Sequence, residues 1–187
     1  MSISDQEQDI LFRQVELAEL EVERAAYARS IIHDLPESDV LSSARDAGVA
    51  ENILATLRFG VPTILAEDIE KPAVFTEYAM SRHEATGEPI KVQRLLAKLS
   101  VPFVGNSAAF QVRPPSQHHS TVLRATVEAG CLTHVISLDH KNVDQSGIEL
   151  NAFLHELKRT LETLRSDFQA AETRLRDKIT QELYERR

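Results

Sequence analysis

The sequence predicts an α+β fold in which a small antiparallel sheet is flanked by a long N-terminal helix and a long C-terminal helix with a heptad pattern. Three observations support this prediction: residues 4–34 lack Gly and Pro, residues 72–141 hold short strand-like runs, and residues 148–187 again lack Gly and Pro. A chain of 187 residues can bury an adequate core, so we expect a single domain, 1–187.

The N-terminal helix is predicted over residues 4–34, because apolar residues recur there at alternating spacings of four and three. They are Leu11, Val15, Ala18, Val22, Ala25 and Ile32. A second apolar face holds Leu17, Leu20, Tyr27 and Ile31. We expect one face to meet the C-terminal helix and the other to meet a second subunit.

The pattern of residues 37–71 predicts short helices and a connection, interrupted by Gly48 and Gly60.

The sheet is predicted over residues 72–141, where β-branched and aromatic runs alternate with turn residues. The runs are AVFTEYAM, IKVQRLL, AFQVRP, STVLRATVE and CLTHVISLD. IKVQRLLAKL would also suit a helix, but the alternation of Ile90 and Val92 favours a strand. Residues 100–119 predict a structural elbow, with Phe103 and Phe110 in the core and Gly105–Asn106 at a turn.

The C-terminal helix is predicted over residues 144–187, beginning near a capping box formed by Ser146 and Glu149. Its leucines keep the four-three spacing of a coiled-coil seam. The predicted interface residues are Leu150, Leu154, Leu157, Leu161, Leu164, Phe168 and Leu175. This seam could pack along residues 4–34 of its own chain or against a second copy, and the sequence leaves both arrangements open.

The composition of the chain indicates which partners and which cellular compartment to expect. The formal net charge of -8 disfavours nucleic acid and anionic membrane surfaces, so we expect a protein partner or effector and a homo-oligomer. The chain has a single cysteine, Cys131, so it cannot form an intrachain disulfide, which fits a cytoplasmic protein. We expect the Cys131 side chain to be buried in the fold as a small hydrophobic group. No signal peptide or membrane span is predicted.

The sequence holds partial signals for two kinds of chemistry, metal binding and nuclease activity, and its spacing supports neither. His118, His119, His134 and His140 are close in sequence, but no helical HxxxH or HExxH spacing supports a metal site, and no cofactor is expected. HVISLDHK ends a predicted strand in Asp139-x-Lys141, as in restriction-type nucleases, with Glu128 as the nearest second acidic ligand. A tight hairpin would place Glu128 and Asp139 at opposite ends of a strand. We therefore expect no catalytic residues, and a metal-dependent nuclease is kept as the alternative.

The stretch PFVGNSAAFQVRPPS resembles a Pro-Phe-x-Gly-(Asp or Asn)-x-x-x-Phe-x-x-x-Pro stretch in uncharacterised bacterial modules. In those modules a helical part precedes a small sheet and a long helix follows, often ahead of a nuclease or other effector domain associated with defence. The likeness covers residues 30–187, with Asn106 where Asp is more usual and no effector domain after YERR. The resemblance implies the sensing or regulatory half of a larger system, or a truncated fragment.

The function expected from these observations is a non-enzymatic regulatory, sensing or scaffolding module. It would act through protein–protein association in bacterial antiviral defence.

Overall fold

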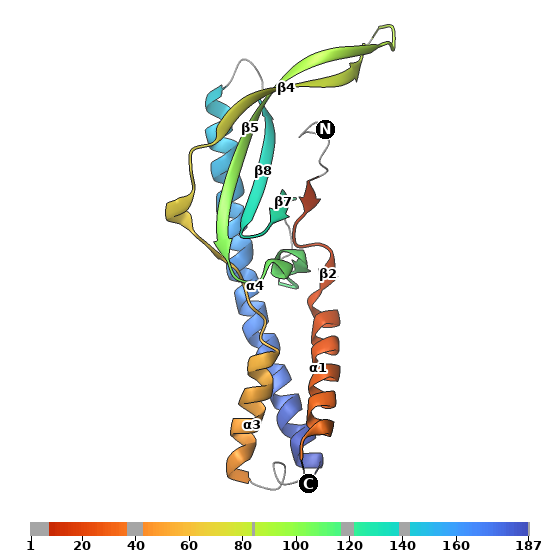
Figure 1. The fold of residues 1–187 in the computed structure, drawn as a ribbon, viewed down its shortest axis with the longest axis vertical. Helices are drawn as coiled ribbons and strands as arrows, with labels where there is room; N and C mark the ends of the chain where they lie inside the picture. Colours follow the sequence, from red (N-terminus) through yellow and green to blue (C-terminus); the bar gives the residue numbers. More distant parts are fainter. Residues whose placement is uncertain (1–7, 37–42, 84, 117–121, 139–142, 187) are drawn as a thin grey trace. The chain divides into compact units, whose positions relative to one another are not determined.

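The computed structural model describes residues 8–36, 43–83, 85–116, 122–138 and 143–186 (Figure 1). Its contacts form two compact units. The sheet unit comprises Met1–Leu11, Pro62–Ser107 and Ser120–Arg159, and the helical unit comprises Phe12–Val61, Ala108–His119 and Thr160–Arg187. The structure mixes helices with an antiparallel sheet and has a long C-terminal helix, so the predicted α+β class is confirmed.

The sheet unit is built on six antiparallel strands in the order β1-β7-β8-β5-β3, with β4 also paired to β5. The strands are β1 (Asp9–Ile10), β3 (Thr63–Ile64), β4 (Ala73–Arg82), β5 (Pro89–Val104), β7 (Arg124–Glu128) and β8 (Cys131–Leu138). A short 3-10 helix, η2 (Ala66–Asp68), precedes β4. The unit also contains the first part of the helix α4 (Val143–Glu185).

The central strand is β5, which confirms the strand prediction for residues 90–99. Ala97, Leu99 and Val101 alternate along one face of β5 and are buried. Leu99 pairs with His134 of β8, and the His134 ring stacks on Phe153 of α4 with centroids 4.0 Å apart. Since directly opposite residues share a face, α4 covers the face of the sheet that carries the buried β5 residues.

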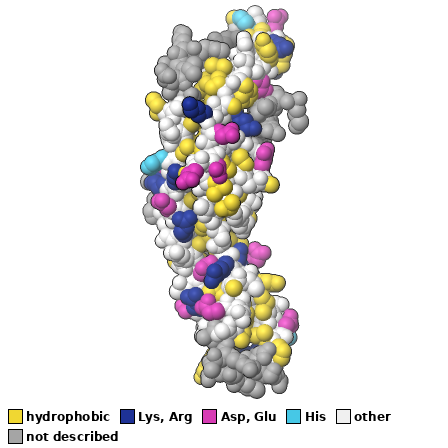
Figure 2. Space-filling view, turned by 60° about the vertical axis from the view of Figure 1, so that its left-hand side comes forward, with side chains coloured by type: hydrophobic (Ala, Val, Ile, Leu, Met, Phe, Trp, Pro, Cys, Tyr) yellow, Lys and Arg dark blue, Asp and Glu magenta, His cyan; other side chains and the backbone are white. Residues whose placement is uncertain are grey.

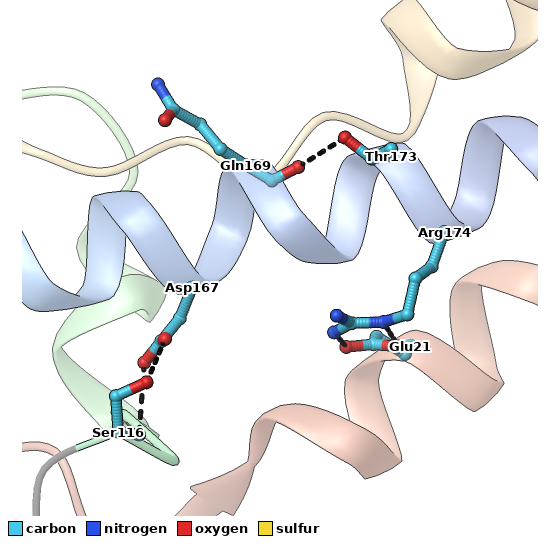
Figure 3. Close-up of polar contacts among 6 residues, drawn as sticks. All are labelled: Glu21, Ser116, Asp167, Gln169, Thr173 and Arg174. Carbon is cyan, nitrogen blue, oxygen red and sulfur yellow. Dashed lines mark hydrogen bonds and ion pairs between the residues drawn. The ribbon is translucent and has the colours of Figure 1, made fainter.

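The helical unit contains α1 (Leu17–Asp34), α3 (Ser43–Thr56) and the part of α4 that begins at Thr160. A short parallel pair joins β2 (Val15–Glu16) to β6 (Val112–Arg113), and the 3-10 helix η3 (Ser107–Gln111) precedes β6. Figure 3 shows two polar contacts of α4 in this unit. Arg174 pairs with Glu21 of α1, and Asp167 accepts a hydrogen bond of 2.5 Å from the Ser116 hydroxyl.

Arg24 connects the three helices of the helical unit. Its guanidinium donates to the carbonyl oxygens of Leu57 and Arg58, beyond the end of α3, and lies 4.4 Å from the centroid of the Phe59 ring. The Phe59 amide donates to a carboxylate oxygen of Glu172 on α4 at 2.9 Å. Burial lowers the pKa of Arg24, while the charges of Glu23 and Glu172 oppose that shift. The half-buried cation is therefore stabilised by carbonyls, a ring face and nearby carboxylates.

The predicted N-terminal helix was wrong at its start, because residues 9–16 form β1, β2 and a bend, and α1 begins at Leu17. The side chains of Leu11 and Phe12 are buried at that bend, and Phe12 has a left-handed φ of 59°. Their amides donate to the carbonyl oxygens of Leu123 and Phe110, respectively. These distant partners satisfy the backbone in place of helical ones.

Two further boundaries differ from the prediction. The helix α3 runs through Gly48, because one glycine costs a helix only about 1 kcal/mol and Ile53 and Leu54 are buried on the same helix. The first half of AFQVRP belongs to η3, and its short strand β6 pairs with β2 in parallel outside the main sheet. The main sheet also recruits β1 and β3 from outside residues 72–141.

The predicted long C-terminal helix is confirmed by α4, which has 43 residues. Its apolar stripe is buried in both units. The buried stripe residues are Leu150, Phe153, Leu157, Leu161, Leu164, Phe168, Ala171, Leu175, Ile179 and Leu183. A single chain therefore covers nearly all of the predicted seam, while Leu154 is half-buried.

Replacing Leu164 with Ala should lower the free energy of unfolding by about 2–5 kcal/mol, because the side chain is 0% exposed and its removal leaves a cavity. Chemical denaturation measures this loss. The matched control is Glu162→Ala, an exposed position two residues earlier on α4, which should stay within about 0.5 kcal/mol of the unmodified chain. Equal stability of the Leu164 variant and the control would show that the stripe is solvated.

Over its described part, residues 100–116, the predicted elbow is confirmed. Phe103 and Phe110 are buried, Gly105 bends the chain with a φ of 111°, and the Phe110 ring meets the Phe12 ring edge-on with centroids 5.9 Å apart.

Because the Phe110 side chain is buried, Phe110→Ala should lower the free energy of unfolding by about 3–5 kcal/mol. Thermal and urea unfolding would measure it. A fully stable Phe110 variant would contradict a structural role for the elbow.

Candidate functional site

A two-stranded β-arm extends beyond the main sheet within the sheet unit (Figure 1). The β8 ladder on β5 begins at the pair Leu95↔Leu138, whereas β4 continues along β5 to the pair Arg82↔Pro89. Residues 77–94, which we call the β-arm, are therefore paired by β4 and β5 alone among the described strands. Isolated two-stranded ribbons are only marginally stable in water, and an extension of this kind is stabilised by the sheet that it continues or by a further strand.

The turn of the β-arm follows from its sequence. The His83 amide donates to the Glu88 carbonyl oxygen at 2.8 Å, and the Gly87 amide donates back to the His83 carbonyl oxygen at 2.8 Å. Gly87 has a φ of 70°, in the left-handed region where glycine carries no steric cost. The sequence predicted turn residues between the runs AVFTEYAM and IKVQRLL, and the structure confirms a turn there.

One face of β4 exposes large apolar side chains. Val74 is 49% exposed, Tyr78 58% and Met80 67%. All three occupy even positions, so they share a face of the strand. The Lys91 ammonium lies 4.7 Å from the centroid of the Tyr78 ring, which orients the ring without covering it. Together these side chains make an apolar strip suited to contact with another protein.

The charges near the apolar strip are mixed. The β-arm carries Glu77 and Glu88 together with Arg82, Lys91 and Arg94. Figure 2 shows Lys and Arg side chains interspersed with Asp and Glu over the described residues of one face. A nucleic-acid surface would instead concentrate one sign of charge, so the mixed pattern favours a protein as partner.

A groove of about 300 Å³ lies in the helical unit, between α1 and the C-terminal part of α4. Its floor includes Ala28, Ile32 and Ile179. The ion pair between Arg29 and Glu182, 2.6 Å long, stands at its rim. The groove shows that α1 meets α4, as the sequence predicted. The predicted division into two faces was wrong, because Ile32 of one face and Leu17 of the other are both buried, whereas Val22 is 68% exposed. On α1, Tyr27 is exposed, so the other predicted use of this helix, contact with a second subunit, stays a prediction.

The predicted metal and nuclease residues are only partly described. His118, His119, Asp139, His140 and Lys141 lie outside the described residues. Among the described residues, no group of three or more His, Cys, Asp or Glu side chains could hold a metal ion. Cys131, predicted to be buried, is half-buried.

The β7–β8 hairpin separates the two ends of the proposed nuclease motif. Glu128 pairs with Cys131 at the turn, whereas Leu138 ends β8 at the far side. Seven residues of extended strand span about 23 Å, well beyond the reach of ligands that share one ion. Glu128 therefore lies far from the strand end that precedes Asp139.

His134 is a partly buried histidine of the sheet unit. Its Nδ1 lies 2.7 Å from the carbonyl oxygen of Arg124, so Nδ1 carries the proton and donates it. Burial lowers the pKa of His134, while this hydrogen bond and the charge of Glu149 raise it by less. The stacked, hydrogen-bonded ring joins β8 to β7 and α4, which is a structural role.

Comparison with protein-family models, with curated proteins and with solved structures gave no match. Within the part of the chain that the structure describes, no helix is both long and apolar enough to cross a bilayer. The resemblance of PFVGNSAAFQVRPPS to defence-associated modules therefore stays an expectation.

The lowered pKa of His134 gives a pH-dependent contribution to stability. Because the folded chain favours the neutral imidazole, this contribution is fully present above 6.5, the ordinary pKa, and is lost as the pH falls toward the lowered pKa. We predict that the melting temperature of His134→Gln changes less than that of the unmodified chain between about pH 7 and 5. The control is His155→Gln, which replaces an exposed histidine on α4. Equal slopes for all three proteins would contradict the prediction.

Proposed function

We propose that this chain is a non-enzymatic module that acts through protein–protein association in a regulatory, sensing or scaffolding role. The observation that carries the proposal is the apolar strip of β4, in which Val74, Tyr78 and Met80 are exposed on one face. Large apolar side chains grouped on a projecting element mark interaction surfaces in soluble proteins. The acidic net charge of the chain and the mixed charges near the strip support a protein partner.

The resemblance to modules that precede effector domains supports a place in bacterial antiviral defence. In that setting the chain would control a nuclease or other effector through contacts rather than through its own chemistry. The α4 seam, predicted from the sequence as the interface, is buried within the chain over most of its length, so we propose the β-arm as the surface through which the chain associates with another protein chain.

The test is affinity purification of the full chain from its native cells, with the recovered proteins quantified by mass spectrometry. The double variant Tyr78→Ser/Met80→Ser should lose about tenfold or more of each specific partner, as expected when a central apolar contact is removed. The matched control is Tyr184→Ser, which removes a tyrosine that is 71% exposed on α4. Partner recovery that is unaffected by the double variant would remove the β-arm from the function.

A further inference from the structure

The open edge of β4 is regular along its whole length. Ten consecutive residues pair with β5, from Ala73↔Lys98 to Arg82↔Pro89, without a bulge. No proline interrupts β4, and no described strand pairs with its other edge. Proteins usually protect long edge strands with prolines, bulges or covering segments, because the free backbone groups attract another strand.

The turn of the β-arm determines which residues direct their backbone groups to this edge. The His83 amide bonds to Glu88 across the hairpin. Hydrogen bonding to a neighbouring antiparallel strand alternates along the chain, so the odd-numbered residues of β4 bond to β5. The even-numbered residues then direct their N–H and C=O groups outward. They are Val74, Thr76, Tyr78, Met80 and Arg82.

We propose that the partner of this edge is β4 of a second copy of the chain, paired antiparallel about a two-fold axis at Tyr78. This inference rests on the proposed function and names its partner. In this register Tyr78 lies opposite Tyr78 of the second copy, Thr76 opposite Met80, and Val74 opposite Arg82. All five outward-facing residues meet outward-facing residues, so each N–H finds a C=O. If the register shifted by one residue, residues whose N–H and C=O groups face the open edge would lie opposite residues whose groups already bond to β5.

The side chains of β4 are also compatible with their own copy. The strand carries one acid and one base, Glu77 and Arg82, so two copies meet with no net charge. Like charges directly opposite one another would destabilise the pairing of two strands. In this register no two residues of like charge lie directly opposite one another. The exposed Tyr78 and Met80 would be brought against apolar or neutral side chains of the second copy. An isologous contact of this kind satisfies both copies at once and closes into a dimer.

The product would be a four-stranded antiparallel ribbon in the order β5-β4-β4-β5. Its interface involves one short strand from each copy, so it belongs at the small end of stable interfaces. We therefore expect a dimer that dissociates on dilution. Sedimentation velocity over a wide concentration series should show growth from 21.0 kDa toward twice that mass. A chain that stays at 21.0 kDa at every concentration overturns the proposal.

Single cysteines test the register in a Cys131→Ser background. Tyr78→Cys would place two sulfur-bearing residues with Cα atoms about 5.5 Å apart, within the range for a disulfide. The matched control is Met80→Cys, whose own copy lies about 14 Å further along the strand. Oxidation should give about tenfold more cross-linked dimer for Tyr78→Cys than for Met80→Cys. A mixture of Met80→Cys and Thr76→Cys chains should cross-link to each other. Equal cross-linking of both single variants overturns the register.

A proline at an outward position separates edge pairing from folding. Thr76→Pro removes an N–H that faces the open edge, so it should abolish the dimer and leave the melting temperature of the chain nearly unchanged. Its control is Ala79→Pro, which removes an N–H bonded to β5 and should lower the melting temperature. A dimer that survives Thr76→Pro overturns the proposal. A chain that is monomeric but still loses captured proteins in the Tyr78→Ser/Met80→Ser variant overturns self-pairing alone and leaves the proposed function standing.

Discussion

The apolar stripe of α4 is the constraint on which the rest of the structure depends. One helix of 43 residues supplies core side chains to both compact units, from Leu150 in the sheet unit to Leu183 in the helical unit. At about 1.5 Å per residue it is longer than a small domain is wide, so a single layer could not cover it. The sheet covers its first part, whereas α1, α3 and the segment around Phe59 accompany its second part.

The elements that could be predicted are those whose pattern is local. The spacing of leucines in α4 reflects burial of one face, and the sequence shows that pattern directly. The strand β5 was likewise predicted from a local pattern, the alternation of Ile90 and Val92. The start of α1 could not be predicted in this way. Leu11 and Val15 match a helical spacing, but their backbone partners are about a hundred residues away, at Leu123 and Val112. A spacing pattern records which residues are buried and does not record what buries them.

The candidate site shows the same limit. The sequence predicted both strands of the β-arm, and the seam of α4 was the more conspicuous apolar pattern. The exposure of Tyr78 and of Leu164 depends on whether a neighbouring helix or strand extends far enough to cover each side chain. Tyr78 is exposed because its partner Gln93 lies beyond the last pair of the β8 ladder, Leu95↔Leu138. One signal was available, since AVFTEYAM carries apolar residues on both faces and a half-buried strand needs only one.

The continuity of α4 also limits how this chain can change in length. Each residue inserted between Leu164 and Leu175, inside the helical unit, would rotate the rest of α4 by about 100°. Leu175 and Ile179 would then leave the buried face that Leu164 and Phe168 occupy. A change of seven residues completes two turns to within about 20° and preserves a common face. Within this unit the helix can therefore lengthen or shorten only in steps close to a heptad.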